Sequence, residues 1–432
     1  MDDQKEKIKK LVFEYVGSKT KHNFIPGETN IPPSGKVIDH NEVWNIIDSA
    51  LDMWLTTGRF NNEFENKLAK FIGIKKLITV NSGSSANLVA FTSLTSSTLG
   101  EKAIQKGDEV ITVAAGFPTT VNPIIQNGCI PVFVDIDPKT HNINPNLIEE
   151  AISNKTKAIM IAHSLGNPFE LERVVKICQE HNLWLIEDCC DALGSKYNNQ
   201  NVGTFGHIAT LSFYPAHHIT MGEGGAVFSN DKKLMKIAES IRDWGRDCYC
   251  PPGEDNTCKK RFDWQLGGLP HGYDHKYTYS NIGYNLKASD MQAAIGASQI
   301  EKIPDFIKAR IRNFEYLYEK FTDFEVFDLP KWDSKAEPSW FGFPLTINNK
   351  ANFKRLDLLK FYDERNIGTR LLFAGNILLQ PAYMDLKLGK PEDFPVANNV
   401  SENTFWLGVF PGLTKEMLDF VVNSTREFLD HN

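Results

Sequence analysis

The sequence predicts an α/β protein in which helices flank a mostly parallel sheet, with a smaller α/β domain at the C-terminal end. Short β-branched and apolar runs alternate with helical patterns through the first two thirds of the chain. This alternation is typical of βα units around a parallel sheet. Strands are expected at residues 77–80, 110–113, 132–134, 158–162, 183–186, 211–214 and 226–228. A strand near 341–345 and a helix near 415–428 mark the smaller domain.

Composition excludes several classes of partner. The 432 residues suffice for two domains with a sizeable core. Acidic residues outnumber basic ones, 54 to 47, and no basic tract is present, which argues against nucleic acid. The first 16 residues form a charged amphipathic pattern without the apolar core of a signal peptide. No segment approaches the ~20 apolar residues of a membrane span, so we expect a cytoplasmic protein without a membrane partner.

The chain divides into three predicted parts. Residues 1–38 are expected to form a helix and an extended lead-in, 39–321 a large cofactor-binding domain, and 322–432 a small domain. Asp39 and Glu42 resemble a capping box that opens a helix through about residue 55.

A long irregular segment, residues 243–284, interrupts the large domain and contains three cysteines. Loops of this length within a compact domain are usually functional or disordered. The cysteines favour function.

Candidate ligand-binding residues follow the expected strands, where ligands of open α/β sheets bind. The sequence NSGSSA at 81–86 leads from a strand into a helical pattern, and such a helix N-terminus offers N–H groups to a phosphate. A serine N-cap explains the same pattern equally well. Asp188 follows the strand at 183–186, where a buried acid is costly unless it is paired.

The segment LSFYPAHHITMGEGGAVFS, residues 211–229, has the spacing of a strand, a functional loop and a second strand. Its glycines permit close backbone approach. A plain hairpin with two incidental histidines is an equal alternative from this segment alone.

These motifs resemble the active-site signature of the sugar aminotransferases, the DegT/DnrJ/EryC1/StrS family of vitamin B6-dependent enzymes with the aspartate aminotransferase fold (fold type I). The residues SF at 212–213 and EGG at 223–225 fit, but His217 stands where that family has its catalytic lysine. Without this amine no Schiff base can tether pyridoxal phosphate. The resemblance therefore implies pyridoxamine 5′-phosphate bound without a covalent link.

The resemblance also implies the roles of individual cofactor-binding residues. A phosphate turn, an aromatic residue stacked on the pyridine ring, and an acid that keeps the ring nitrogen protonated are all matched. An asparagine that reaches the phosphate of a neighbouring subunit implies a homodimer. In this sequence the corresponding residues are Gly83, Ser84, Ser85, Phe117, Asp188, Asp191, Ser212 and Asn285. Asp191 stands where members of the family usually have His or Gln. Without the resemblance, Phe117 would be interpreted as a residue of the hydrophobic core.

Four cysteines form the second constellation: Cys190, Cys248, Cys250 and Cys258, separated by 57, one and seven residues. Four thiolates in this pattern suit a [2Fe-2S] cluster or a structural zinc ion. Spacing alone slightly favours zinc, although zinc sites usually contain C-x₂-C rather than C-x-C.

The cysteines and His217 together resemble one branch of the family, which dehydrates CDP-4-keto-6-deoxyglucose at C-3 on the way to 3,6-dideoxysugars. The resemblance implies a [2Fe-2S] cluster and a separate flavin-dependent NADH reductase as electron donor. It implies that His217, rather than His218, removes a proton from the methylene carbon of the cofactor, since neutral imidazole is basic near pH 7. His163 is open to a place in the sugar site or a structural role.

Two alternative functions stay open. One is a GDP-4-keto-6-deoxymannose 3-dehydratase type, which also has histidine for lysine but lacks the cluster; the cysteines argue against it. The other is a non-catalytic, zinc-stabilised B6-binding scaffold. Asp188, Ser212 and the phosphate turn argue against that reading, because a scaffold needs no electron sink.

Overall fold

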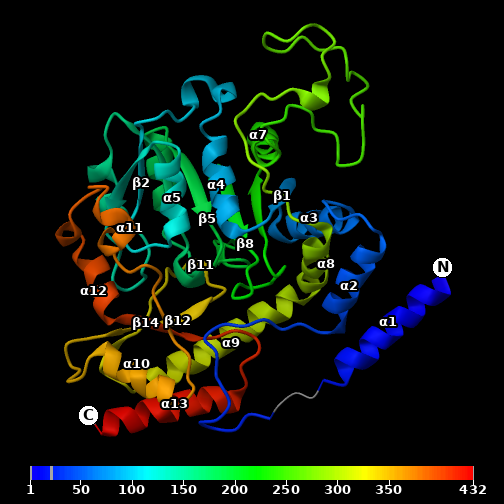
Figure 1. The fold of residues 1–432 in the computed structure, drawn as a ribbon. Coiled ribbons are helices and arrows are strands. Elements are labelled where there is room, and N and C mark those ends of the chain that lie inside the picture. Colours follow the sequence, from blue (N-terminus) through cyan, green and yellow to red (C-terminus); the bar gives the residue numbers. More distant parts are fainter. Residues whose placement is uncertain (1, 20–22, 432) are drawn as a thin grey trace.

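The computed structural model describes residues 2–19 and 23–431. The expected segment limits at residues 1 and 432 lie outside it, as does residue 22 within the expected lead-in. Three hydrophobic clusters fill the interior, two of them against the faces of a central sheet and the third in the C-terminal part (Figure 1). The helices of the large part are α1 (Asp2–Gly17), α2 (His40–Leu51), α3 (Arg59–Ile72), α4 (Gly83–Ser93), α5 (Pro118–Gln126), α6 (Leu171–Glu180), α7 (Lys232–Arg242) and α8 (Asp290–Gln299). The remaining helices are α9 (Ile303–Phe321), α10 (Arg355–Glu364), α11 (Pro381–Met384), α12 (Pro395–Asn403) and α13 (Lys415–Asp430).

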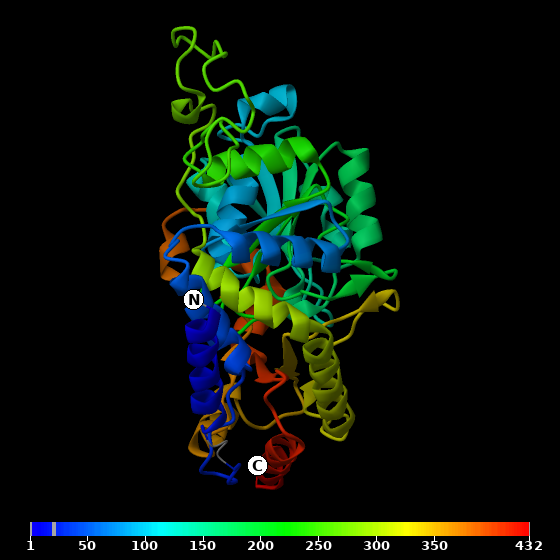
Figure 2. The same ribbon diagram turned by 90° about the vertical axis from the view of Figure 1, so that its right-hand side faces the viewer.

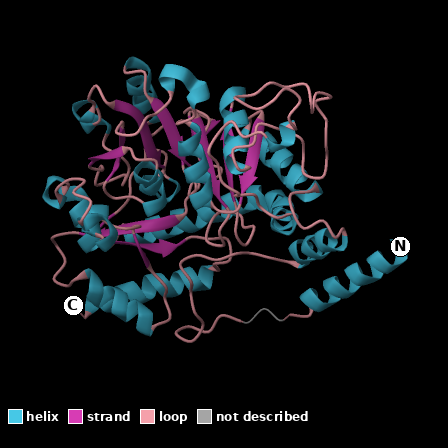
Figure 3. Ribbon diagram, turned by 45° about the horizontal axis from the view of Figure 1, so that its top comes forward, coloured by secondary structure: helices cyan, strands magenta, loops and turns pink. Residues whose placement is uncertain are grey.

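A seven-stranded sheet with the order β1-β9-β8-β5-β4-β2-β3 forms the centre of the large part. β9 pairs antiparallel with both of its neighbours, and the other pairings are parallel, which confirms the predicted mostly parallel sheet. Helices lie on both faces of the strands (Figure 3). The strands are β1 (Lys76–Val80), β2 (Glu109–Val113), β3 (Ile130–Val134), β4 (Thr156–Ala162), β5 (Trp184–Asp188), β8 (Ile208–Ser212) and β9 (Gly225–Ser229).

The apolar runs become strands because both of their faces are covered. Every residue of β8 and β9 is buried, as is typical of a strand between two helical layers. The capping box of Asp39 and Glu42 forms at the start of α2 as predicted. The helix ends at Leu51 rather than near residue 55, because Met53 adopts a left-handed backbone with φ of 54°.

The C-terminal part contains an antiparallel sheet with the order β10-β12-β14-β13. Its strands are β10 (Phe327–Asp328), β12 (Gly342–Ile347), β13 (Arg370–Leu371) and β14 (Thr404–Gly408). Helix α9 contributes to two cores, since Phe306 packs with the large part and Phe314 with the small one. A third sheet of short strands, β6 (Lys196–Tyr197), β7 (Gln200–Asn201) and β11 (Ala336–Glu337), joins the two parts.

The chain after β13 returns to the large part. Asn376 bridges to Ala115, and the amide of Ile377 donates to the carbonyl of Ala114 over 2.9 Å. The small domain therefore contacts the ends of the central strands directly.

The predicted irregular segment 243–284 forms a long loop that projects beyond α7, away from the small domain (Figures 1 and 2). Two isolated bridges close its base, Asp243 to Asn285 and Arg246 to Tyr279. Its one helical element in the described chain is a short 3₁₀ turn, His275–Tyr277. Across residues 2–19 and 23–431, no helix combines the length and apolar character that crossing a membrane requires.

Gly225 illustrates how closely the sheet meets the helix that follows β1. A Cβ atom at this position would overlap the carbonyl of Ser82, the N-cap residue of α4. We predict that Gly225→Ala lowers the free energy of unfolding by about 1–3 kcal/mol, the usual effect of overpacking. Gly268→Ala, where the added Cβ meets no atom within 4 Å, is the matched control and should change stability little in denaturant titrations. Equal stability of the two variants would contradict this packing.

Candidate active site

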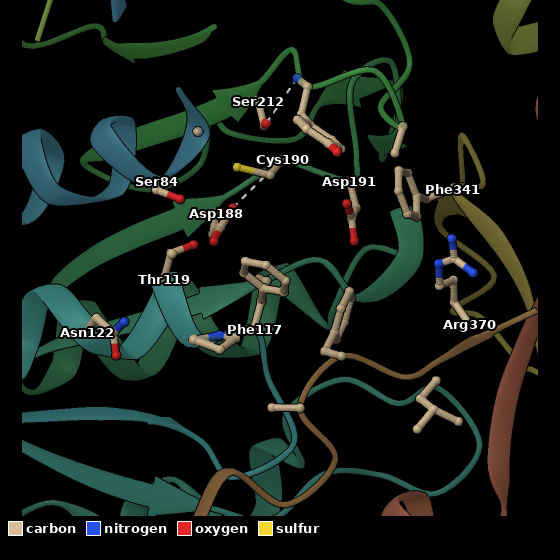
Figure 4. Close-up of a pocket in the computed structure, with 18 of the residues that line it drawn as sticks. Ser84, Phe117, Thr119, Asn122, Asp188, Cys190, Asp191, Ser212, Phe341 and Arg370 are labelled. Carbon is tan, nitrogen blue, oxygen red and sulfur yellow. Dashed lines mark hydrogen bonds between the residues drawn. The ribbon is translucent and has the colours of Figure 1, made fainter. Parts of the chain in front are cut away.

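A cavity of about 1080 Å³ opens at the carboxyl ends of the central strands, where the sequence predicted a ligand site. The last residues of three neighbouring strands reach it: Ala162 of β4, Asp188 of β5 and Ser212 of β8 (Figure 4). Of the predicted cofactor-binding and catalytic residues, those that line the cavity are Gly83, Ser84, Phe117, Asp188, Asp191, Ser212 and His217.

Asp188 is 4% exposed and is held by three donors. Asn87 and Thr120 donate to Oδ2 over 2.7 and 2.8 Å, and the amide of Cys190 donates to Oδ1 over 3.1 Å. These hydrogen bonds compensate the burial of an ionised carboxylate. The arrangement suits an acid that pairs with a protonated ring nitrogen.

The N-terminus of α4 lies where the sequence predicts a phosphate turn. Ser82 is its N-cap and accepts a hydrogen bond from the amide of Ser85 over 3.0 Å. The amides of Gly83 and Ser84, which face the cavity, have no acceptor in the described chain. The helix dipole and these N–H groups fit a phosphate, with Ser212 beside them, whereas Ser85 lies outside the cavity lining.

Phe117 does not lie in the core. Its side chain is half exposed, lines the cavity and meets Phe373 edge to face with ring centroids 6.1 Å apart. It precedes Pro118 at the start of α5, which holds its ring at the cavity wall. This position fits a flat aromatic ligand.

The adjacent histidines have different surroundings. His217 lines the cavity, with its ring 5.2 Å from that of Phe341. His218 is buried, and its Nε2 lies 2.8 Å from the carbonyl of Ser339. Burial holds the pKa of His218 well below its usual range, so His218 stays neutral and structural.

Asp191 is the carboxylate nearest to His217. Its Oδ1 lies 3.3 Å from His217 Nδ1, although the contact lacks the alignment of a hydrogen bond. Burial raises the pKa of Asp191, and the contact with His217 offsets part of this effect. Arg310, fully buried, donates to the carbonyls of His217 and Phe341 over 3.2 Å each. It therefore holds in place the histidine loop, residues 213–224, which connects β8 to β9.

His163 has the structural role that the sequence left open. It is fully buried, stacks on Phe169, and places Nε2 3.1 Å from Glu187. Asn285 is exposed and lies outside the cavity of its own chain. Its predicted contact with a neighbouring subunit stays a prediction.

The four predicted cluster ligands do not meet at one point in the described structure. Cys248, Cys250 and Cys258 line a small hollow in the projecting loop, together with His275. Cys190 lies in the large cavity instead, beside Asp188. The reason is that Cys190 belongs to the turn after β5, whereas the other three belong to a loop outside α7. In this conformation of one chain, three of the four cysteines surround a common hollow that could hold a metal centre, and Cys190 does not.

Sequence reasoning missed the supports of Asp188 and the far wall of the cavity. Thr120 lies three residues after Phe117, in the first turn of α5, and its nearness to that predicted residue is the signal that could have found it. The far wall comes from segments distant in sequence and carries no local signal. Its members are Ser34, Phe341, Arg370, Phe373, Tyr383 and Trp406.

The sheet order, the acid at the end of β5 and the phosphate turn of α4 define a fold type I enzyme of the pyridoxal phosphate class. The chain belongs to the DegT/DnrJ/EryC1/StrS aminotransferase family, whose model matches residues 36–426. It is 56% identical over 430 residues to the lipopolysaccharide biosynthesis protein RfbH of Salmonella typhimurium (strain LT2), covering 99% of this chain and 98% of that protein.

Two further relatives bear on the chemistry. The chain is 49% identical over 427 residues to dTDP-4-dehydro-2,6-dideoxy-D-glucose 3-dehydratase of Saccharopolyspora spinosa, covering 99% of this chain and 92% of the relative. The solved structure of E. coli GDP-4-keto-6-deoxy-D-mannose-3-dehydratase with bound hydrated PLP matches with a TM-score of 0.81 and 28% identity. That match covers 91% of this chain and 99% of the other.

We predict that Asp188→Asn weakens binding of pyridoxamine 5′-phosphate about 10- to 100-fold, because a charge-assisted hydrogen bond contributes about 1.5–3 kcal/mol. Equilibrium dialysis with the free cofactor measures this directly. Asp191→Asn changes a partly buried carboxylate that contacts His217 instead, and it should weaken cofactor binding less than Asp188→Asn does. The opposite ranking would assign the ring nitrogen to Asp191.

Proposed function

We propose that this protein removes the C-3 hydroxyl from a nucleotide-linked 4-keto-6-deoxysugar, with pyridoxamine 5′-phosphate bound without a covalent link. The observation that carries the proposal is His217 in the cavity beside Asp188 and Asp191. None of the described residues that line this cavity is a lysine, so a tethering amine is absent from its described wall. An imidazole in this position suits proton transfer rather than a Schiff base.

When bound, the cofactor supplies an amine that condenses with the 4-keto group and a ring that accepts electrons. The chain's own residues would do the rest. Gly83, Ser84 and Ser212 would bind the cofactor phosphate, and Phe117 would stack on the ring. Asp188 would hold a proton at the ring nitrogen, with Asn87 and Thr120 fixing its carboxylate.

His217 would act as the base. We assign the proton of the neutral ring to Nδ1, which lies 3.3 Å from Asp191 Oδ1, so that the basic lone pair is on Nε2. Nε2 would accept a proton from the methylene carbon and return it to the departing C-3 hydroxyl, so that the hydroxyl leaves as water. This role makes His217 the catalytic residue of the proposal.

The substrate we propose is CDP-4-keto-6-deoxyglucose, and the pathway is surface-polysaccharide synthesis. Similarity to a lipopolysaccharide biosynthesis protein supports the pathway, and similarity to a 3-dehydratase of a dTDP-linked sugar supports the reaction class. The dTDP-linked sugar has thymine as its base, so the proposed cytosine base depends on the resemblance carried by the four cysteines and His217. The GDP-dependent alternative is supported by a lower identity, 28%.

Electron supply is the second part of the proposal. The product needs two electrons after loss of the hydroxyl, and we propose a [2Fe-2S] cluster and a flavin-dependent NADH reductase as their source. The grouping of Cys248, Cys250 and Cys258 supports a metal centre in the loop. We also propose a homodimer, in which Asn285 serves the partner subunit. Cys190 would be the fourth ligand, although it lies in the large cavity and apart from the loop group.

We predict that His217→Asn binds the cofactor but exchanges its methylene proton with solvent at least about 100-fold more slowly, because an amide is no base. Proton NMR of the bound cofactor in D₂O measures the exchange. His218→Asn is the control and should retain exchange if it folds. Normal exchange in His217→Asn, with loss in His218→Asn, would move the catalytic role by one residue.

We predict about two irons per chain and an EPR signal on reduction in anaerobically purified protein. Cys250→Ser should lose both signals and still bind the cofactor, whereas Cys129→Ser, at a buried position far from the loop in sequence, should keep them. Full iron content in Cys190→Ser would remove Cys190 from the ligand set. Stoichiometric zinc after reconstitution with iron and sulfide would overturn the cluster altogether.

A further inference from the structure

The cavity extends beyond the cofactor-binding residues into an outer compartment built by the small domain. Several of its residues come from β13, β14 and the segment that returns to the large part. These residues are Arg370, Leu371, Phe373, Gln380, Tyr383 and Trp406. No role was assigned to any of them from the sequence.

Arg370 is the one lysine or arginine among the described residues that line the cavity. Its side chain is exposed, and its Nη1 donates to the carbonyl of Thr369 over 2.8 Å. Among the ion pairs of the described chain, none includes Arg370, although many of the other cations have one. A guanidinium group that faces a cavity without a carboxylate partner is suited to an anionic ligand.

The backbone around Arg370 is fixed on both sides. In the β13–β14 pairing Arg370 lies opposite Trp406, and the Trp406 indole donates to the carbonyl of Leu371 over 3.0 Å. Before the strand, the amide of Gly368 donates to the carbonyl of Ile31 over 2.8 Å. The arginine therefore starts from a rigid strand, and only its side chain needs to be ordered by a ligand.

Arg370 and the phosphate turn lie at opposite ends of the cavity. Figure 4 shows Ser84, Asp188 and Ser212 on one side, Asp191 in the middle, and Arg370 beyond Phe341 on the other side. The middle is acidic and would repel a diphosphate, whereas each end offers a positive potential. One end suits the cofactor phosphate, which leaves the other for a second anion.

On the basis of the proposed function, we infer that Arg370 binds the diphosphate of the nucleotide-linked sugar. This contact directs the sugar inward to His217 and leaves the nucleoside in the outer compartment, beyond the guanidinium. Arginine can contact two phosphate oxygens at once, so the contact orients the substrate as well as binding it. Arg370 is thus a positioning residue that acts on the substrate and takes no part in proton transfer.

The test uses the full-length protein loaded with pyridoxamine 5′-phosphate and titrated with CDP-glucose, dTDP-glucose and GDP-glucose, which lack the 4-keto group and cannot react. Isothermal titration calorimetry should show that Arg370→Gln binds the preferred probe about 10- to 100-fold more weakly than the wild type. Arg370→Lys should recover part of the loss, and the wild-type affinity should fall with salt. Arg365→Gln, a change in the same segment at a residue paired with Glu427, is the matched control and should bind normally.

The outcomes separate this inference from the proposed function. If the wild type binds a probe and Arg370→Gln binds it equally well, Arg370 does not hold the diphosphate, although the proposed reaction stands. If all variants retain the cofactor but the wild type binds none of the three probes, the nucleotide-sugar function fails, and this inference fails with it. An equal loss in Arg365→Gln would show a general effect on the small domain and would also overturn the assignment.

Discussion

The buried carboxylate of Asp188 is the constraint on which the rest of the active site depends. An ionised group in this position must be compensated, and its three donors come from three separate elements. Asn87 belongs to α4, Thr120 to α5, and the Cys190 amide to the turn after β5. Each element also supplies something else to the cavity: α4 its N-terminal turn, α5 the preceding aromatic ring, and the turn Asp191. A single ionic group therefore aligns the parts that would hold a phosphate, a ring and a base.

A second buried charge connects this arrangement to the small domain. Arg310 lies on α9, the helix shared by two cores, and burial lowers its pKa to about 10, within the range where it stays protonated at neutral pH. It donates to backbone carbonyls of the histidine loop and of the segment that leads into β12. A buried cation satisfied by carbonyls costs less than one left unpaired, and it resists displacement of either segment. The position of His217 is thus tied to the domain that also presents Arg370.

The parts of the site that sequence could predict are those that follow strand ends. The hydrophobic run at 183–186 locates β5, and the position of Asp188 at its carboxyl end follows from that geometry, whereas Ser212 was assigned through the family resemblance. The direction of each histidine could not be predicted locally, because His217 and His218 are adjacent in a turn without strand or helix periodicity. The outer wall was missed for a different reason. Arg370 and Trp406 meet through an antiparallel pairing across 35 intervening positions that no local pattern specifies.

The cysteines also show what sequence alone cannot predict. Their spacing indicates a metal-binding set, but it does not show where each cysteine lies in the fold. Thr257 donates to the Cys250 thiol over 3.1 Å, and hydrogen bonds of this kind, acting against partial burial, lower the pKa of Cys250. Burial and the neighbouring Asp188 instead raise the pKa of Cys190 well above its usual value. Metal ligation requires the thiolate, so the surroundings favour the ligating form at Cys250, whereas burial raises the pKa of Cys248 in the same loop. Binding of a metal ion by Cys190 would require removal of its thiol proton, which costs free energy in these surroundings. The positive charge of the metal ion beside Asp188 and Asp191 would offset that cost.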